Sequence, residues 1–351
     1  MTHSLTAIFH GSGLPLELRQ LPVPALKPGE ILVRNEYTTL CRSDLNTVSG
    51  RRTEPCPTIL GHEVVGHIAD FGPEAAVSDV MGRPLALGDR ISWAIFASDP
   101  GSPMALRGIP QKGAGLFKYG HERLTEDSVL HGGLSQYLIL RPHTPIAKLS
   151  GALLPGEAAI ISCAVATAAG ALRLAEGVRG KHVLISGAGM LGMIACAMSR
   201  SAGAASVTAM DPNRERLAMA CEFGADEALP AGGDSGRRFD VLIELSGASA
   251  AMEHTLRLLE TGGTAVWAGA TYPERAVQLP AEYLVRHLLT LKGLHNYNLD
   301  DFAAAVRFME AHHRDFPFGS MIHDQFTLPE INEAFSYGFT ANPFRVGVRI
   351  P

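Results

Sequence analysis

The sequence predicts an α/β protein with two domains, one β-rich and one in which helices cover a doubly wound parallel sheet. Three observations favour this arrangement. The chain has 351 residues, and a single hydrophobic core usually stops growing below that length. Short strands and turns dominate up to about Pro145, whereas strands and helices alternate after Pro155, as is typical of a parallel sheet. A glycine-rich loop at residues 187–192 also lies between an apolar strand and a helix.

The expected strands of the β-rich part are short, and Gly, Pro or Asp residues bound each of them. They cover Thr6 to Phe9, Glu17 to Gln20, Glu30 to Glu36, Val64 to Phe71, Arg90 to Phe96 and Leu134 to Leu140. The interval from Ala97 to Gly133 contains many Gly and Pro residues and lacks a clear period. It therefore predicts an irregular surface lobe.

The second part is expected to begin with a helix from Gly156 to Glu176, followed by alternating strands and helices. These cover His182 to Ser186, Val207 to Met210, Arg214 to Phe223, Val241 to Leu245, Ala250 to Leu259 and Thr264 to Ala268. The tail predicts helices at Leu299 to His312 and near Leu328 to Phe335, then a strand at Phe344 to Ile350 that returns to the first domain. The predicted domains are therefore 1–164 with 298–351, and 165–297.

The composition is that of an ordinary soluble protein, 46% hydrophobic and 19% charged. A formal charge of −5 gives no electrostatic reason to expect nucleic acid or an anionic membrane as partner. The five cysteines are odd in number and widely spread, unlike a disulfide framework. The first ten residues do not resemble a signal peptide, and no apolar run reaches the roughly 18 residues of a membrane span. We therefore expect a cytoplasmic protein.

The glycine-rich loop has the context that a dinucleotide-binding loop requires. Its first glycine permits a tight turn, the second lets the backbone approach a pyrophosphate, and the third lets helix and strand pack closely. The loop residues expected to bind the cofactor are Gly187, Gly189, Met190, Leu191 and Gly192. The alternative for such a loop alone is an ordinary glycine-rich βα turn.

Asp211 makes the dinucleotide interpretation more specific, because it ends the next strand nineteen residues after Gly192. A carboxylate there hydrogen-bonds the ribose hydroxyls of NAD and repels the 2′-phosphate of NADP, so we expect NAD. Arg214 and Arg216 lie nearby, and arginine can hold a 2′-phosphate. With Asp211 present, we interpret Arg214 as a solvent-exposed helix residue and place Arg216 among the cofactor-binding candidates.

Three residues match the ligands of a catalytic zinc. Cys41 and His62 stand twenty-one residues apart, and Cys163 follows at the start of a later helix. Catalytic zinc takes three protein ligands of the thiolate and imidazole type and keeps one position open. Each residue alone is more simply a buried side chain, and Cys56, Cys196 and Cys221 are interpreted that way. Together, Cys41, His62 and Cys163 predict a Cys₂His site.

The sequence resembles the zinc-dependent, medium-chain alcohol dehydrogenase superfamily over essentially its whole length. The motifs that carry the resemblance are Cys41-Arg42-Ser43-Asp44, Gly61-His62-Glu63-Val64-Val65-Gly66, Gly88-Asp89-Arg90, Cys163 with Thr167, and the nucleotide loop with Asp211. The resemblance implies a GroES-like catalytic domain, built from both ends of the chain, and a Rossmann domain. It also implies one catalytic zinc on Cys41, His62 and Cys163, with Glu63 able to approach the metal.

The resemblance assigns further roles by position. Ser43 is expected to take the substrate's proton, and Asp44 to orient His62. Arg42 and Arg345 resemble arginines that reach the cofactor pyrophosphate, although Arg345 could equally be a solvated strand residue. Thr167 is expected beside the nicotinamide.

The chain also departs from the family pattern. The histidine that extends the proton relay in many relatives is Asn46 here, which leaves water or a ribose hydroxyl to carry the proton. The four cysteines of a second, structural zinc are replaced by Asp99, Ser102, Ala105 and Gly113. That zinc is therefore predicted to be absent, and the lobe is expected either to be held by packing and hydrogen bonds or to be mobile.

A short segment of the lobe resembles a subgroup of these dehydrogenases associated with phosphonate breakdown. It comprises Arg107 to Lys112 and Phe117 to Glu122. Lys118, His121 or His295 could bind an anionic group there; the alternative for the first two is a solvated loop.

The predicted function is zinc- and NAD-dependent hydride transfer between a small alcohol and the nicotinamide, which gives an aldehyde or ketone. One alternative is a zinc-free quinone or enone reductase of the same superfamily, which the three ligands disfavour. Another is a non-catalytic nucleotide-binding protein on this scaffold. The resemblance also implies a homodimer or homotetramer that pairs through a sheet edge, with Leu288 to Leu294 as the candidate strand.

Overall fold

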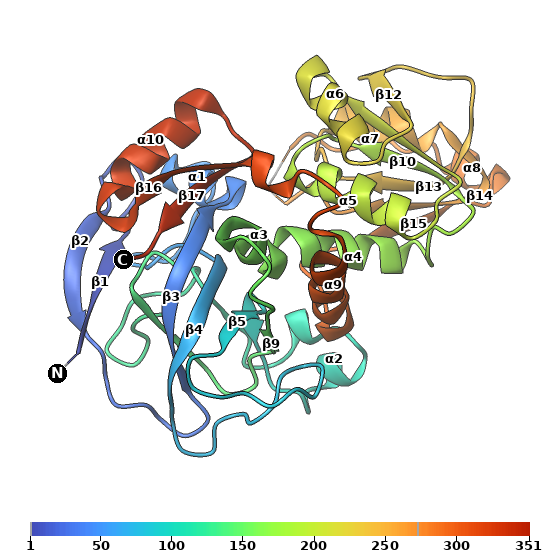
Figure 1. Cartoon of the computed structure of the whole chain (residues 1–351). Coiled ribbons are helices and arrows are strands. Elements are labelled where there is room, and N and C mark those ends of the chain that lie inside the picture. Colours follow the sequence, from blue (N-terminus) through green and yellow to red (C-terminus); the bar gives the residue numbers. More distant parts are fainter. Residues whose placement is uncertain (1, 272–273) are drawn as a thin grey trace. The chain divides into compact units, whose positions relative to one another are not determined.

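The computed structural model describes residues 2–271 and 274–351, and the chain divides into two compact units. The first unit comprises Met1–Cys163, Asn298–His313 and Phe318–Pro351, and the second comprises Ala164–Tyr297 and Arg314–Pro317 (Figure 1). The first unit thus ends one residue before the predicted boundary, and a four-residue segment of the tail belongs to the second unit.

A seven-stranded sheet forms the framework of the first unit. Six of its strands follow the order β16-β17-β3-β4-β5-β9, and β8 also pairs with β3. All pairings are antiparallel except that of β16 with β17. The strands are β3 (Ile31–Leu40), β4 (Glu63–Phe71), β5 (Arg90–Trp93), β8 (Tyr137–Leu140), β9 (Ile146–Lys148), β16 (Ile322–Thr327) and β17 (Arg345–Arg349). Each predicted strand of the first domain has a counterpart, but the predicted Arg90 to Phe96 strand stops at Trp93, and Phe96 begins β6 of another sheet. Strands β9 and β16 were not expected.

Two small antiparallel sheets complete the first unit. One pairs β1 (His3–Ile8) with β2 (Glu17–Pro22), and the other pairs β6 (Phe96–Ala97) with β7 (Phe117–Lys118). The second of these ties the lobe to the end of the predicted Arg90 to Phe96 strand. The lobe also contains α2 (Pro103–Leu106) and a 3₁₀ turn, Pro110–Lys112.

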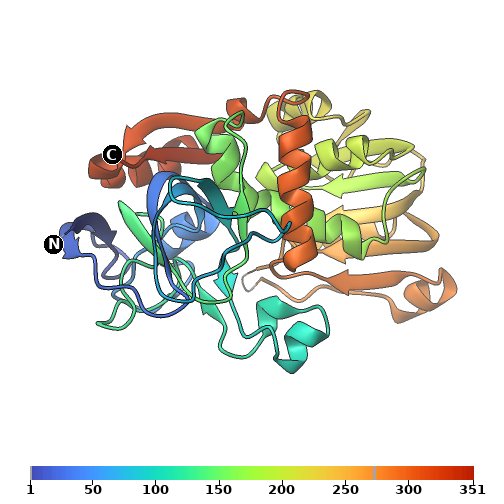
Figure 2. The same ribbon diagram turned by 60° about the horizontal axis from the view of Figure 1, so that its bottom comes forward.

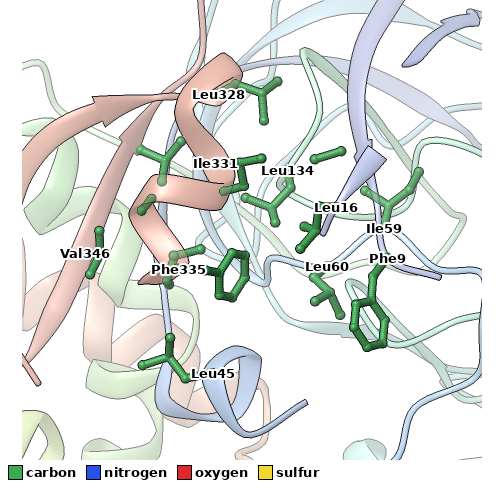
Figure 3. Close-up of a cluster of buried hydrophobic side chains, with 14 of the residues drawn as sticks. Phe9, Leu16, Leu45, Ile59, Leu60, Leu134, Leu328, Ile331, Phe335 and Val346 are labelled. Carbon is green, nitrogen blue, oxygen red and sulfur yellow. The ribbon is translucent and has the colours of Figure 1, made fainter. Parts of the chain in front are cut away.

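The core of the first unit joins the two ends of the chain. Phe9, Leu60 and Leu134 pack in one cluster with Phe335 and Val346 (Figure 3). These side chains are at most 3% exposed, and the burial of a large apolar side chain contributes about 1.5–3 kcal/mol. The C-terminal segment therefore returns to the first domain as predicted, because its apolar face completes this core.

The second unit contains a parallel sheet of six strands in the order β12-β11-β10-β13-β14-β15. They are β10 (His182–Ser186), β11 (Ser206–Asp211), β12 (Glu227–Pro230), β13 (Phe239–Glu244), β14 (Leu259–Trp267) and β15 (Thr290–Gly293). Counted from β10, this is the strand order 3-2-1-4-5-6 of a Rossmann fold. The predicted fold class is confirmed, and β15, within the predicted Leu288 to Leu294 strand, lies at the edge of the sheet.

Helices pack along this sheet, as Figures 1 and 2 show. Helix α5 (Met190–Ser201) contacts β10 and β11, α6 (Arg214–Glu222) contacts β11 and β12, and α7 (Ser249–Leu256) contacts β13 and β14. Helix α4 (Ala164–Leu174) packs on α5, and α8 (Ala281–Arg286) precedes β15. The alternation of strands and helices along the second unit agrees with the sequence prediction.

The remaining helices belong to the first unit. They are α1 (Arg42–Val48), α3 (Pro155–Ala159), α9 (Leu299–His312) and α10 (Ile331–Ala341), with 3₁₀ turns at Ile160–Ser162, Phe318–Met321 and Leu328–Glu330. No single helix among the described residues is long and apolar enough to cross a membrane, although the broken pair Pro155–Ser162 and Ala164–Leu174 together reaches that length and composition.

The expected continuous helix from Gly156 to Glu176 is wrong. The helix stops at Ala159, a 3₁₀ turn follows, and Cys163 leaves the helical region with φ −127° and ψ −69°. The Ser162 hydroxyl donates to the backbone carbonyls of His62 and Ala159, which competes with regular helical hydrogen bonding. The break lies immediately before the helix that opens the second unit, so Cys163 belongs to the first unit.

Candidate metal centre and dinucleotide loop

Four side chains of the first unit converge on one point. The ligand atoms of Cys41, His62, Glu63 and Cys163 all lie within 4.8 Å of one another. Cys41 follows β3, His62 immediately precedes β4, Glu63 is the first residue of β4, and Cys163 follows the 3₁₀ turn after α3. The antiparallel pairing of β3 with β4 places Thr39 opposite Glu63, which brings the ends that carry Cys41 and His62 together.

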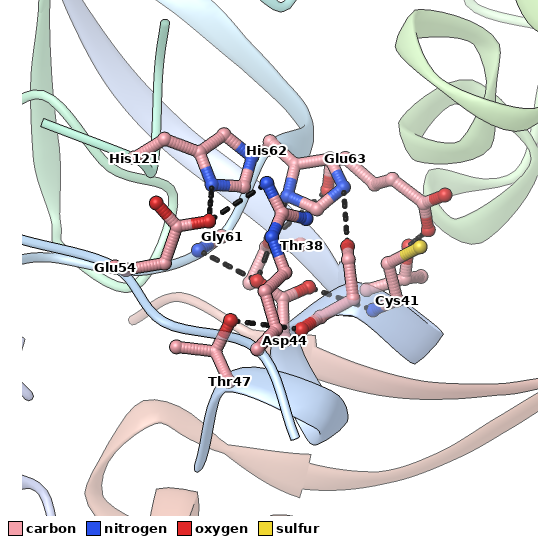
Figure 4. A network of polar contacts seen from close by, with 12 residues as sticks. Thr38, Cys41, Asp44, Thr47, Glu54, Gly61, His62, Glu63 and His121 are labelled. Atoms are coloured by element: carbon pink, nitrogen blue, oxygen red, sulfur yellow. Dashed lines mark hydrogen bonds and ion pairs between the residues drawn. The ribbon is translucent and has the colours of Figure 1, made fainter. Parts of the chain in front are cut away.

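Asp44 fixes the local geometry of Cys41 and His62 (Figure 4). Its carboxylate accepts a hydrogen bond from the backbone N–H of Cys41 at 2.8 Å, which caps the start of α1. Its other oxygen lies 3.5 Å from His62 Nδ1. That distance is an ion-pair contact and too long for a good hydrogen bond, so Nδ1 has no hydrogen-bond partner among the described residues.

Arg345 occupies the far side of Glu63. Its Nε and Nη2 donate to the two Glu63 oxygens at 2.6 and 2.8 Å, and Nη2 also lies 3.4 Å from Cys41 Sγ. The Thr39 hydroxyl donates to the same carboxylate at 2.6 Å. Both side chains of the pair are buried. The structure thus places Arg345 against the candidate metal centre, and its contact with the cofactor pyrophosphate stays a prediction.

The two cysteines have pKa values that shift in opposite directions. A hydrogen bond from Cys163 lowers the pKa of Cys41 well below its usual range, and the charges of Arg345 and His62 add to this effect. The same hydrogen bond, together with burial, raises the pKa of Cys163. Burial works against the charged form of His62, yet Asp44 and Cys41 outweigh it and raise the His62 pKa.

This donor set fits zinc. Two sulfur atoms and one imidazole within 4.8 Å of one another match the ligands that zinc prefers. Arg345 cancels the charge of Glu63, which leaves two thiolates to balance a divalent cation. Zinc binding would remove a proton from the Cys163 thiol and a proton from the imidazolium of His62. The residues predicted from sequence as metal ligands are therefore brought together.

The structure also places the other predicted catalytic residues. Ser43 Oγ lies 3.3 Å from His62 Nε2, and Ser43 is therefore beside the cluster. Arg42 is exposed and contacts Asn342. Thr167 is half-buried on α4 in the second unit. The roles of these residues stay predictions.

The glycine-rich loop of the second unit has the geometry that the sequence predicts. Gly187 has φ +97°, and a Cβ there would lie 2.7 Å from the backbone N of Ser246. A Cβ on Gly192 would lie only 1.9 Å from the Gly187 carbonyl oxygen, whereas one on Gly189 would meet nothing within 4 Å. Gly187 and Gly192 therefore serve packing. Open space at Gly189, the N-cap of α5, suits close approach of an anionic group to Met190 and Leu191.

Asp211 lies at the end of β11, next to this loop. Its two oxygens accept hydrogen bonds from the backbone N–H groups of Ala188 and Asn213, both at 2.8 Å. These bonds fix the carboxylate beside the loop and leave lone pairs for ribose hydroxyls. Arg216 lies in the first turn of α6, where the Asn213 side chain accepts from its backbone N–H.

Sequence reasoning singled out His121 but missed its partners near the metal centre, Arg52 and Glu54. Arg52 Nη2 lies 2.7 Å from Glu54 Oε1, and the same oxygen lies 3.0 Å from His121 Nδ1. The ring of His121 stands 5.0 Å from that of His62 at an interplanar angle of 35°. The sequence separation of sixty-seven residues between Glu54 and His121 left no local signal for this contact, although Arg52 and Glu54 lie between two predicted ligands.

The lobe is held by hydrogen bonds and by buried aromatic packing. The Tyr119 hydroxyl lies 2.6 Å from Thr144 Oγ1, and its side chain is fully buried. Ser98 Oγ donates to the Pro110 carbonyl oxygen at 2.8 Å, and Ser102 caps α2. The resemblance implied a structural-zinc position at Ser102, and here this residue serves as a helix cap.

Comparison with known proteins agrees with a chain of two parts. An alcohol dehydrogenase GroES-like domain matches residues 27–150, and a zinc-binding dehydrogenase domain matches residues 191–311. D-altritol 5-dehydrogenase of Agrobacterium fabrum is 28% identical over 295 residues, 80% of this chain and 81% of the relative. A probable D-xylulose reductase A of Aspergillus terreus is 30% identical over 305 residues, 81% of each chain.

A solved structure gives the same result for the whole chain. The alcohol dehydrogenase of Thermotoga maritima matches with a TM-score of 0.93 and 26% identity over 100% of both chains. The relatives are named as dehydrogenases or reductases of alcohols and polyols, which supports an oxidoreductase. The chain belongs to the zinc-dependent medium-chain alcohol dehydrogenase superfamily.

Proposed function

We propose that this oxidoreductase depends on one catalytic zinc and on NAD, and that it interconverts a small alcohol and the corresponding aldehyde or ketone. The observation that carries the proposal is the convergence of Cys41, His62, Glu63 and Cys163. When bound, zinc supplies Lewis-acid polarisation of the substrate oxygen, and NAD accepts the hydride.

The residues around the cluster have distinct tasks in this proposal. Asp44 holds the N–H of Cys41 and faces the imidazole of His62, so it keeps two ligands in register. Ser43, whose hydroxyl lies beside His62, receives the substrate's proton. Arg345 donates two hydrogen bonds to the Glu63 carboxylate and balances its charge beside the cluster.

The second unit supplies cofactor binding. The amides at the start of α5, beside the open space at Gly189, hold the pyrophosphate. Asp211 accepts hydrogen bonds from the adenosine ribose hydroxyls, and its negative charge disfavours a 2′-phosphate. NAD is therefore the proposed cofactor.

An assay of NAD⁺ reduction tests this function. Zinc-loaded protein should reduce NAD⁺ with one or more members of a panel of alcohols and polyols. Cys163→Ser should abolish the reaction. Cys196 is a buried cysteine of the second unit, and Cys196→Ser should leave the reaction intact. Asp211→Asn should lower the preference for NAD⁺ over NADP⁺ by about tenfold or more, because one anionic partner of the ribose is removed. Wild-type preference for NADP⁺ would contradict the cofactor assignment.

Two other outcomes correspond to the alternative functions. Reduction of a quinone or enone by metal-free protein would favour the zinc-free reductase. Cofactor binding without turnover of any substrate in either direction would favour a nucleotide-binding protein.

A further inference from the structure

A chain of three polar side chains begins beside the candidate metal centre, and Figure 4 labels two of them, His121 and Glu54. His121 packs beside His62, Glu54 bonds His121, and Arg52 pairs with Glu54. All three residues belong to the first unit. We refer to them as the Arg52–Glu54–His121 chain.

The side chains around the cluster differ in their exposure to solvent. The side chains of Asp44 and Glu63 are 0% exposed and that of Arg345 is 4% exposed, so these neighbours close the cluster off. In the Arg52–Glu54–His121 chain, the side chains of His121 and Glu54 are 9% and 8% exposed, and that of Arg52 is 36% exposed. His121, whose ring stands 5.0 Å from that of His62, is thus the polar side chain between the cluster and the more exposed Arg52.

The hydrogen bond to Glu54 sets the tautomer of His121. A carboxylate only accepts hydrogen bonds, so the proton of a neutral imidazole lies on Nδ1, which faces Glu54 at 3.0 Å. The Nε2 atom then carries a lone pair. Among the described residues, no hydrogen bond to this atom is present.

The charge of the chain is balanced. The guanidinium of Arg52 is already paired with Glu54 at 2.7 Å, and His121 faces the same carboxylate. An anionic substituent would have to displace Glu54 from Arg52, whereas a hydroxyl needs only an acceptor. The Arg52–Glu54–His121 chain is thus polar, and its positive charge is already paired.

We infer that His121 Nε2 binds a second hydroxyl group of the substrate, so the alcohol oxidised at this centre is a diol or polyol. The inference rests on the proposed function and specifies its substrate class. Glu54 and Arg52 position the ring, and His121 itself contacts the substrate. The expectation that His121 binds an anionic group is the competing prediction.

Two substitutions separate the nitrogen atoms of the ring. In His121→Asn the side-chain amide can reach the place of Nδ1 and keep the bond to Glu54, but nothing stands at Nε2. In His121→Gln the amide can reach the place of Nε2. The readout is the ratio of kcat/KM for 2,3-butanediol to that for 2-butanol, with KM and kcat resolved separately, in variants whose zinc content and thermal unfolding match the wild type.

The wild type should prefer the diol, and the ratio should fall about tenfold or more in His121→Asn, mainly through KM for the diol. In His121→Gln the ratio should stay within about threefold of wild type. The same ratio in all three proteins, or a wild-type preference for a carboxylate- or phosphate-bearing alcohol, would overturn the inference.

A binding measurement makes this test independent of turnover. Calorimetry on zinc-loaded protein should give tighter binding for 2,3-butanediol than for 2-butanol, and His121→Asn should remove the difference. Equal affinities in the wild type would overturn the inference. If neither alcohol is oxidised but the binding difference is present, the proposed reaction fails while the hydroxyl site stands.

Discussion

Arg345 should be one of the residues on which the first unit depends most for stability. Replacing it by Met removes both hydrogen bonds to Glu63, at 2.6 and 2.8 Å, and leaves the carboxylate buried without its cation. Removal of one partner of a buried ion pair typically costs about 3–5 kcal/mol. We expect a loss of this size in the free energy of unfolding of Arg345→Met.

The same strand offers a matched control. Arg349 also forms an ion pair with a carboxylate, that of Asp324, but the two side chains are 66% and 38% exposed. Exposed pairs contribute about 0–1 kcal/mol, so Arg349→Met should cost at most about 1 kcal/mol. The buried pair and the exposed pair should therefore differ by several kcal/mol.

Urea unfolding in the presence of a chelator measures this difference, since bound metal then adds nothing. The chain has two tryptophans, and Trp93 on β5 reports on the first unit when Trp267 is replaced by Phe. Adding Glu63→Gln to Arg345→Met should recover part of the loss, because the unpaired charge is removed. If Arg345→Met costs no more than Arg349→Met, the ion pair is not what stabilises this part of the centre.

Three further outcomes follow from the structure. Gly192→Ala should destabilise the second unit and abolish NADH binding, because its Cβ would lie 1.9 Å from the Gly187 carbonyl oxygen; calorimetry and thermal unfolding check both. Gly189→Ala, with open space at its Cβ, should unfold like the wild type yet bind NADH about tenfold more weakly or worse, and unchanged affinity would count against the loop as the pyrophosphate site. Burial lowers the pKa of His131 to about 4 from about 6.5 in the unfolded chain. Below about pH 6.5 the unfolded state therefore binds more protons than the folded state, and the free energy of unfolding falls by up to about 3 kcal/mol toward pH 4. Urea titrations should find this loss absent in His131→Leu but present in His3→Leu.

Much of the fold could be predicted from the sequence because its signals are local. The period of the apolar residues identifies the alternating strands and helices of the second unit. The glycines of the nucleotide loop are required by contacts within a few residues, as with Gly192 and Gly187. Asp211 follows from its place at the end of the next strand.

The metal ligands could be predicted for a different reason. Cys41, His62 and Cys163 belong to two residue types that bind zinc, and only a few combinations of such residues form a catalytic zinc site. Their convergence within 4.8 Å depends on the pairing of β3 with β4 and on the break that precedes α4. That break was not visible in the sequence, since the residues around Cys163 are all compatible with a helix.

The contacts that surround the ligands could not be predicted. Arg345 and Glu63 lie 282 residues apart, and an arginine in a C-terminal strand is equally compatible with a solvated surface. The contact between Glu54 and His121 also depends on how a loop folds back on the centre. Sequence patterns report periodicity along the chain, whereas these contacts are set by packing between distant segments.

Zinc stoichiometry tests the central claim most directly. Protein purified without added metal chelators and measured by mass spectrometry of its metals should contain about one zinc per chain, and Cys163→Ala should lose it while Cys196→Ala retains it. About one zinc in the wild type, lost only in Cys163→Ala, is the result that the structure predicts. Zinc-free wild-type protein that remains fully active, or Cys163→Ala that keeps its zinc, would contradict the assignment of this cluster as the metal centre.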